Sequence, residues 1–290
     1  MPVLLSSFRA HSVRRAVVAA AMFATALTVA CGGGPKRPPT GTPDPDKFLF
    51  ERGTEALDKR RWLVAREYFR ELIDTYPQSP HRADAKLGVG DTYLGEGSAE
   101  SYVLALNEYR EFLAFYPTHE RAGYAQFQLG MTHFRQMHSA DRDQTETRDA
   151  INEFTAFVQR YPTDPKIEEG KQRLREARDR LSQYEYNVGY HYFRSRWYPG
   201  AVDRFRVLLE KDPEFTRRDA VYFYLGECYM KVGRPAEALP YYDRLIKEFE
   251  QSEHLAEAQK RVEAIKSGAA NSENPVKKPE SQVKKSDGGQ

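Results

Sequence analysis

The sequence is poor in cysteine and lacks the common motifs of catalysis. Only two cysteines, Cys31 and Cys228, occur in 290 residues. They are far apart in the sequence, so the closely spaced cysteine pair typical of a zinc site is missing. No glycine-rich loop matches a phosphate-binding pattern, and the nearest approach, residues 86–90, falls in a repeat helix. His133 and His138 miss the i, i+4 spacing that would place two metal ligands on one helix face. These absences predict a protein without metal, cofactor or enzymatic activity.

A strong charge of either sign is also missing. The chain has 44 basic and 42 acidic side chains, a formal net charge of +2. Three of the basic residues lie in the first 30 positions, which hold no acidic residue, so the rest of the chain has 41 basic and 42 acidic side chains. Such a balance gives no electrostatic attraction to a phosphate backbone, and we expect no nucleic-acid partner.

Residues 1–30 have the pattern of a signal peptide. Basic residues precede an apolar stretch, residues 16–30, which is short for a membrane span but suits a signal-peptide core. It ends in Leu-Thr-Val-Ala-Cys at residues 27–31, which resembles a bacterial lipobox with Thr28 in place of the usual Leu. We expect cleavage before Cys31 and a covalent lipid on this cysteine. An ordinary secretory cleavage site beside a chance cysteine is the alternative.

Five copies of one pattern follow the leader. Each copy has an Ala, an aromatic residue four positions later, a bulky apolar residue three further on and, in four copies, a Pro five beyond that. The first three share one helix face, and the Pro ends the helix. The copies are Ala65/Phe69/Leu72/Pro77, Ala105/Tyr109/Phe112/Pro117, Ala150/Phe154/Phe157/Pro162, Ala201/Phe205/Leu208/Pro213 and Ala238/Tyr242/Leu245.

Each copy also has a first half that carries a glycine: Gly53, Gly90, Gly130, Gly189 or Gly226. Glycine lets two backbones approach closely, and the aromatic residue of the second half fills the gap beside it. Repetition at this period predicts an all-α tetratricopeptide (TPR) solenoid of five helix-turn-helix repeats, a fold that usually binds other chains.

The repeat register also locates the irregular parts. The gap from Pro162 to Gly189 is 27 residues where the other three are 13, and apolar residues recur every seven positions within it. We therefore expect an overlong first helix in repeat four and, from the same register, about eight inserted residues around 137–148 in repeat three. Residues 255–265 predict a capping helix.

Composition divides the chain into four parts. We expect a signal peptide over 1–30, a lipidated, Pro- and Gly-rich tether over 31–47, the repeats with their cap over 48–266, and a disordered tail over 267–290.

Two further segments are more specific than a general TPR pattern. Residues 180–188, Arg-Leu-Ser-Gln-Tyr-Glu-Tyr-Asn-Val, close the overlong helix and lead to Val-Asp-Arg at 202–204. The insertion in repeat three contains Asp141, Arg142 and Asp143. With the lipobox-like junction and the Tyr-Pro repeat endings, the chain resembles the BamD family over about residues 31–266. The resemblance implies a scaffold lipoprotein, anchored in the outer membrane and facing the periplasm, in the complex that assembles β-barrel proteins.

The resemblance also implies partners. C-terminal repeats of this family dock a POTRA domain of the barrel protein BamA, which places Arg204 at the contact and Tyr184, Glu185 and Tyr186 beside it. Helix packing for the two tyrosines and a solvated face for Arg204 are the alternatives. N-terminal repeats receive unfolded outer-membrane protein precursors, and other assembly lipoproteins share the complex. Available aromatic and basic residues there are Arg66, Tyr68, Arg70, Tyr76, Tyr93 and Tyr102, of which Tyr93 occupies a packing position.

A second function remains open at this stage. A TPR lipoprotein can also act as a pilotin for a secretin or pilus component, or coordinate cell-wall synthesis. The Tyr-Glu-Tyr and Asp-Arg-Asp segments favour barrel assembly.

Overall fold

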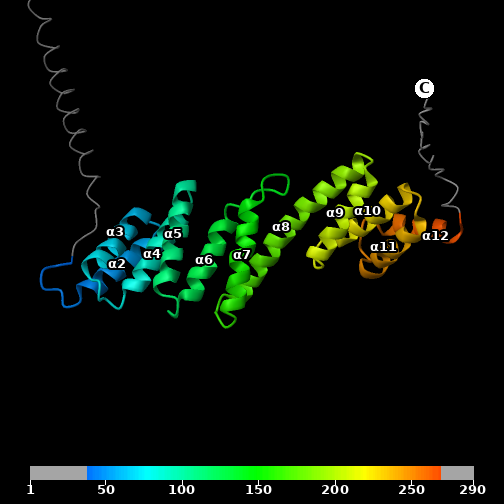
Figure 1. Ribbon diagram of the computed structural model, residues 1–290. Helices are drawn as coiled ribbons and strands as arrows, with labels where there is room; N and C mark the ends of the chain where they lie inside the picture. Colours follow the sequence, from blue (N-terminus) through cyan, green and yellow to red (C-terminus); the bar gives the residue numbers. More distant parts are fainter. Residues whose placement is uncertain (1–37, 269–290) are drawn as a thin grey trace, which may run out of the picture. The chain divides into compact units, whose positions relative to one another are not determined.

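The structure, a computed structural model, describes residues 38–268, and the regular secondary structure in this range is helical (Figure 1). The helices are α2 (Pro45–Asp58), α3 (Trp62–Thr75), α4 (Arg82–Glu96), α5 (Ala99–Phe115), α6 (Ala122–Phe134), α7 (Thr145–Arg160), α8 (Ile167–Arg194), α9 (Tyr198–Lys211), α10 (Arg218–Lys231), α11 (Pro235–Glu248) and α12 (Leu255–Lys266). The expectations for the signal peptide, Cys31 and the tail from residue 269 lie outside the described residues.

The described chain divides into two compact units, residues 38–108 and 109–268, with the division inside α5. In sequence order the helices pair as α2/α3, α4/α5, α6/α7, α8/α9 and α10/α11, and α12 follows the last pair. Short turns join the two helices of each pair, except in the third. The helices of the α2/α3, α6/α7, α8/α9 and α10/α11 pairs pack against each other. The predicted all-α TPR fold with five repeats and a capping helix is confirmed.

Aromatic rings lie against glycines within the helix pairs, as the repeat predicts. A methyl group added at the glycine would fall within 3 Å of the ring in four pairs: Gly53 with Phe69, Gly130 with Phe154, Gly189 with Phe205, and Gly226 with Tyr242. Each of these rings is at most 1% exposed. The close approach of the two helices therefore depends on the missing side chain.

Replacing Gly189 with Ala is expected to destabilise the protein. The added methyl would lie 2.6 Å from the ring of Phe205, which is fully buried and cannot move aside. Overpacking of this kind costs about 1–3 kcal/mol, against about 1 kcal/mol gained in helix propensity. Gly200→Ala is the matched control, because its methyl would meet Trp197, which is 57% exposed, so its ring can rotate toward solvent and lose only its contact with Tyr192. Equal midpoints of urea unfolding for the two variants would contradict this account.

The turn after α3 is held to α2 by a pair of contacts that the repeat pattern did not reveal. The hydroxyl of Ser79 donates a hydrogen bond of 2.7 Å to Asp46, and this bond holds the pKa of Asp46 below its usual value. Two residues later, His81 stacks on Phe50 with ring centroids 4.9 Å apart.

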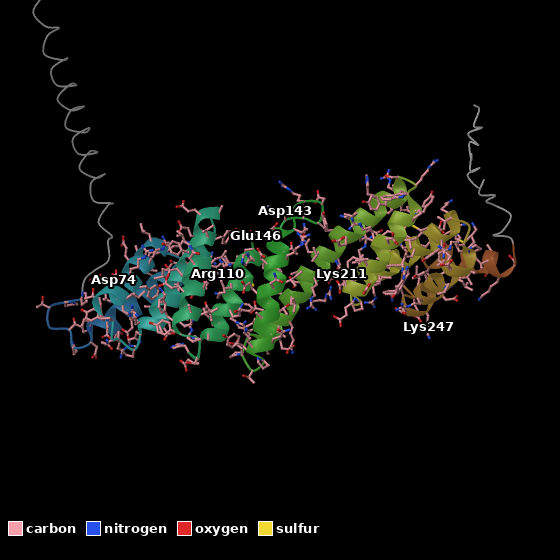
Figure 2. The ribbon with its side chains drawn as sticks, viewed as in Figure 1. Asp74, Arg110, Asp143, Glu146, Lys211 and Lys247 are labelled. Carbon is pink, nitrogen blue, oxygen red and sulfur yellow. The ribbon has the colours of Figure 1, made fainter. Side chains whose placement is uncertain are left out.

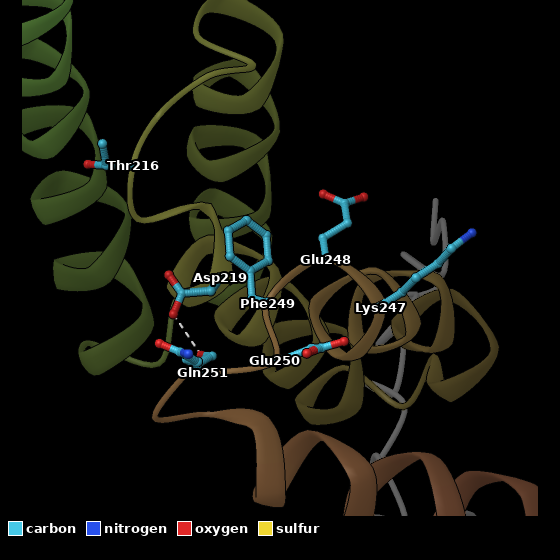
Figure 3. Close-up of a pocket in the computed structure, with 8 residues that line it drawn as sticks. Thr216, Asp219, Lys247, Glu248, Phe249, Glu250 and Gln251 are labelled. Carbon is cyan, nitrogen blue, oxygen red and sulfur yellow. Dashed lines mark hydrogen bonds between the residues drawn. The ribbon is translucent and has the colours of Figure 1, made fainter.

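The same contacts recur in the last repeat, after α11. Ser252 donates to Asp219 over 2.6 Å, and His254 stacks on Phe223 at 4.5 Å. Figure 3 shows Asp219 linked to this turn, with Phe249 beside it at the edge of a polar cleft. Asp-x3-Phe on the first helix and Ser-x-His in the turn are therefore a second repeated pattern of the chain.

The irregular parts fall where the register placed them. Helix α8 has 28 residues, which confirms the overlong first helix of repeat four. Residues 135–144 separate α6 from α7 and confirm the insertion in repeat three. In repeat two the glycine and the alanine, Gly90 and Ala105, are 15 residues apart, where Gly53 and Ala65 of repeat one are 12 apart. These extra residues lengthen α5 to 17 residues. Helix α2 begins at Pro45, three residues before the expected boundary at 48, because proline is favoured in the first turn of a helix.

The capping helix is attached to the last repeat through a buried carboxylate. Glu227 of α10 is 7% exposed and accepts hydrogen bonds from the hydroxyl of Tyr242 (2.7 Å) and from the guanidinium of Arg261 on α12 (2.8 Å). Burial and the neighbouring Glu227 raise the pKa of Tyr242, so its hydroxyl stays protonated and donates.

Removing this carboxylate is expected to loosen the cap. Glu227→Ala leaves Tyr242 and Arg261 without their acceptor and should cost about 2–3 kcal/mol. Amide hydrogen exchange in α12 should become faster, because the contact between Arg261 and Glu227 that attaches this helix is lost. Glu237→Ala removes a carboxylate from an exposed ion pair with Arg234 and should cost less than about 1 kcal/mol. The account fails if Glu227→Ala unfolds at the same urea concentration as the parent.

Candidate functional site

Helix α8 is the platform of the candidate site. At 1.5 Å per residue its 28 residues span about 42 Å, roughly twice the length of α9. Phe157 of α7 lies against Gly170 near its start, and Phe205 of α9 lies against Gly189 near its end. The two neighbours therefore pack on opposite halves of one continuous helix.

Arg204 lies on the exposed side of α9, facing α8. Its guanidinium is 3.8 Å from the carboxylate of Glu185 and 5.9 Å from the ring centroid of Tyr192, and its side chain remains 49% exposed. Trp197 packs edge-on against Tyr192 with centroids 4.8 Å apart and is 57% exposed. We call these four residues (Glu185, Tyr192, Trp197, Arg204) the α8–α9 patch. Exposed tryptophan, tyrosine and arginine are the residue types that dominate protein-binding hot spots.

The turn before α9 fixes the indole of Trp197. Arg196 adopts a positive φ of 62°, which reverses the chain after α8, and Trp197 then takes the N-cap position of α9. Gly200, one turn on, lets the indole lie directly on the helix, where a methyl group would be 2.8 Å from its ring. The indole is thus held beside Tyr192 while much of its surface faces solvent.

The structure separates the two tyrosines of the Tyr-Glu-Tyr segment. Tyr186 is 6% exposed and packs against Phe205 with ring centroids 5.8 Å apart. Burial raises the pKa of Tyr186, so its hydroxyl stays protonated. Tyr184 is partly exposed and lies on a different side of α8 from Glu185, because successive residues of a helix are about 100° apart. Glu185 contacts Arg204 at the surface, and Tyr186 packs α8 against Phe205 of α9 in the core.

A buried carboxylate fixes α8 to the end of α9. Asp212, 7% exposed, accepts both terminal nitrogens of the Arg175 guanidinium, at 2.8 and 2.5 Å, and the hydroxyl of Ser182 at 2.5 Å. Burial would raise the pKa of Asp212, but Arg175 and Ser182 outweigh it and hold that pKa below its usual value. The ionised carboxylate stabilises the fold at neutral pH, and its contribution is lost as the pH falls through this lowered pKa.

The Asp141–Arg142–Asp143 segment is fully exposed on the inserted loop, and the loop is attached to α8. Arg180 donates to the carbonyl of His138 over 2.8 Å, and Asn187 donates to the carbonyl of Ala140 over 3.3 Å. Arg180 and Asn187 are seven residues apart and share one face of α8. The loop and the Tyr-Glu-Tyr segment, 40 residues apart in sequence, therefore adjoin on the same helix.

The end of the loop is ordered by its own side chains. Asp143 accepts the backbone N–H of Thr145 at the start of α7, which lowers the pKa of Asp143 (Figure 2). The amide of Gln144 donates to the carbonyls of Ser139 and Arg142, at 2.8 and 3.0 Å. These bonds hold the three charged residues in one arrangement on the surface.

His133 belongs to the same region. It is 5% exposed, and its Nδ1 lies 2.8 Å from the carboxylate of Glu146 in the first turn of α7. The contact joins the end of α6 to the end of the loop. Among residues 38–268, no group of three or more His, Cys, Asp or Glu side chains is placed to hold a metal ion.

In the first unit, two of the candidate precursor-binding residues, Arg66 and Arg70, contact Tyr93, and Tyr68 is only 6% exposed. The guanidinium of Arg66 stacks over the ring of Tyr93 at 3.7 Å and pairs with Glu96 at 2.5 Å, while Arg70 donates to the hydroxyl of Tyr93 at 2.7 Å. Tyr93 is 5% exposed, which confirms its packing role. Tyr76 and Tyr102 remain partly exposed.

Neither cysteine is available on the described surface. Cys31 lies outside the described residues, and Cys228 is fully buried, as expected, with its pKa raised to about 12 by burial. In the part of the chain from 38 to 268, no helix combines the length and the apolar character needed to cross a membrane.

Comparison with known proteins gives a consistent family. Residues 43–240 match the YfiO family model, described as an outer membrane lipoprotein. The chain is 28% identical over 227 residues to the outer membrane protein assembly factor BamD of Caulobacter vibrioides. This alignment covers 78% of this chain and 73% of the relative. It is 26% identical to BamD of Vibrio cholerae, over 73% of this chain and 90% of the relative.

A solved structure also aligns with the chain. The TPR2AB domain of yeast Sti1, solved in complex with pHSP90, aligns over 78% of this chain and 86% of that chain, at 13% identity and a TM-score of 0.42.

The family model covers more than half of the chain, including the inserted loop, α8 and the α8–α9 patch. The chain therefore belongs to the YfiO family of outer membrane lipoproteins.

Proposed function

We propose that this protein is a non-enzymatic scaffold for the assembly of outer membrane proteins, as the names of its relatives suggest. It docks a POTRA domain of a BamA-like barrel protein through the α8–α9 patch. The observation that carries the proposal is the exposed arginine and tryptophan on either side of Tyr192, held in place by Glu185 and by the turn at Arg196. A rigid aromatic and arginine surface loses little conformational entropy on binding.

Residues near the patch take different parts in this proposal. Arg204 and Glu185 contact the partner directly, and Tyr184 borders the contact on the side of the inserted loop. Tyr186 is buried, so it acts by holding α8 against Phe205 rather than by touching the partner. Asp141, Arg142 and Asp143 offer a second charged surface, for another lipoprotein of the complex.

The remaining parts of the chain complete the proposal. Residues 1–30 are removed as a signal peptide. A lipid on Cys31 anchors the protein in the outer membrane, and residues 31–47 are the tether that links this anchor to the repeats. Residues 48–266 face the periplasm. Unfolded precursors bind the first unit, where Tyr76 and Tyr102 are partly exposed. An extended peptide with aromatic side chains and a terminal carboxylate suits such a surface.

Purification from the native envelope tests the function as a whole. Full-length tagged protein, extracted in mild detergent, should carry a BamA-like barrel protein in a fixed ratio that mass spectrometry can measure. Recovery of a secretin, a pilus component or a septal factor in its place would overturn the proposal. A matched purification of an unrelated lipoprotein at the same level controls for membrane carry-over.

A further inference from the structure

A groove over the middle of α8 adjoins the Arg204 contact, with which it shares only Glu185. It lies between α7, α8 and α9 and has a volume of about 430 Å³. Apolar residues from three helices line it, and we call them its apolar floor: Ile151 from α7, Leu181 from α8 and Val207 from α9. Val207 is 43% exposed, which is high for an apolar residue of a packed helix. We call this feature the α8 groove.

The groove exists because α8 is overlong. The glycines that receive Phe157 of α7 and Phe205 of α9, Gly170 and Gly189, are 19 residues apart, about 28 Å along the helix. Both flanking helices reach the middle turns of α8, α9 through Asp212 and α7 through Ile151, and the groove lies where the three helices meet. The stretch from Arg178 to Glu185 that lines the groove spans about 10 Å, or two turns.

The rim of the groove is basic. Arg148, Arg178 and Lys211 line it from three different helices, and none of them forms an ion pair with another residue of the described chain (Lys211 is labelled in Figure 2). Its two acidic lining residues, Glu185 and Asp212, already contact the arginines described above. An apolar floor with three unpaired cations attracts aliphatic side chains flanked by carboxylates.

The walls of the groove favour a helical occupant. α7, α8 and α9 satisfy their own backbone hydrogen bonds, so they offer no free edge to an extended strand. An extended segment would leave its N–H and C=O groups unpaired against the apolar floor. A helix satisfies its backbone internally and presents side chains at i, i+3, i+4 and i+7, the spacing that a two-turn groove accepts.

We propose that the α8 groove binds an acidic amphipathic helix of a partner protein, with aliphatic side chains on Ile151, Leu181 and Val207 and carboxylates on Arg148, Arg178 and Lys211. The inference concerns a surface separate from the exposed side chains of Trp197 and Arg204, and it does not depend on which protein those side chains bind.

Site-specific photo-crosslinking in the native envelope tests this. A photoreactive amino acid replaces Val207 in the full-length lipoprotein, and mass spectrometry reads the sequence of the crosslinked segment. The expected adduct is a segment with aliphatic residues at helical spacing and Asp or Glu between them. Arg148→Glu/Lys211→Glu should lower the adduct yield at least about tenfold, since each lost charge pair is worth about 1 kcal/mol or more. Arg206→Glu/Lys231→Glu, on exposed faces of α9 and α10, is the matched charge control.

The outcomes separate cleanly. A Lys-for-Glu exchange in the mapped segment that restores crosslinking to the Arg148→Glu/Lys211→Glu protein would establish the charge pairing. A basic or non-helical segment, a lipid adduct, or no protein adduct at Val207 would overturn the inference. Circular dichroism of each variant confirms that the helices are intact. If the barrel partner were absent from the native complex but the acidic helix crosslinked, the proposed function would fail and this inference would stand.

Discussion

Arg204→Glu is expected to weaken capture of the barrel protein by about 30-fold or more, the effect of removing one interface hot spot of about 2 kcal/mol. The guanidinium is held by Glu185 at 3.8 Å and lies near Tyr192, so the partner meets an oriented cation. A glutamate in its place would repel Glu185 and any acidic group of the partner. Detergent pull-down with quantitative mass spectrometry, or titration against purified periplasmic domains, measures the loss.

The fold should tolerate the change at Arg204. The side chain is exposed, and an exposed ion pair such as that with Glu185 contributes little to the stability of the fold. Glutamate also forms helices as well as arginine does. Arg206→Glu is the matched control, because it makes the same charge change two residues away on another exposed face of α9. Unchanged capture by Arg204→Glu would remove this residue from the interface. An equal loss with Arg206→Glu would show that net charge, and not the patch, governs binding.

Cys31→Ser is expected to release the protein from the membrane almost completely. Lipid attachment requires the thiol, and stable anchoring needs more than one acyl chain on the protein. The variant should move from the membrane to the soluble fraction and migrate differently on a gel, because the lipid is absent. Membrane fractionation and mass spectrometry of the N-terminal peptide give both results.

The second cysteine provides the control for the anchor. Cys228 is fully buried, and burial raises the pKa of its thiol to about 12, so it is neither accessible nor reactive. Cys228→Ser should leave membrane association unchanged while lowering stability slightly, since it buries a hydroxyl in an apolar core. Persistence of Cys31→Ser in the membrane fraction with unchanged mobility would refute lipidation at Cys31.

Much of the architecture could be predicted from local spacing. Ala, aromatic and apolar residues at fixed offsets share a helix face, and a proline two residues beyond the end stops each of four second helices. The glycine–aromatic pairs follow from the same register, because a buried ring needs a position without a side chain. The overlong α8 and the insertion before α7 appear as breaks in an otherwise regular count.

Contacts between distant segments could not be predicted in this way. Asp212 meets Arg175 across 37 residues, and the inserted loop meets α8 across more than 40. The Ser79–Asp46 and Ser252–Asp219 bonds were visible as a repeated pattern only after the structure showed which residues meet. The extra residues of repeat two gave no sign that they would extend α5.

The candidate site shows the same division. Arg204, Glu185 and the Tyr-Glu-Tyr segment were singled out by their resemblance to a family, but their spacing did not distinguish a core tyrosine from a surface one. Only the packing of α9 on α8 buries Tyr186 and leaves Arg204 half exposed. Trp197 stands between the Tyr-Glu-Tyr segment and Arg204 in the sequence, and it joins the patch because Arg196 turns the chain there.

By itself the sequence determined the helical repeat and its irregular members, because these depend on residue types at short, fixed separations. The tertiary structure alone decided which polar groups pair, which side chains stay exposed, and that a groove lies where α7, α8 and α9 meet. The physical reason is that burial and charge pairing depend on distances between helices, and those distances follow from side-chain packing rather than from separation along the chain.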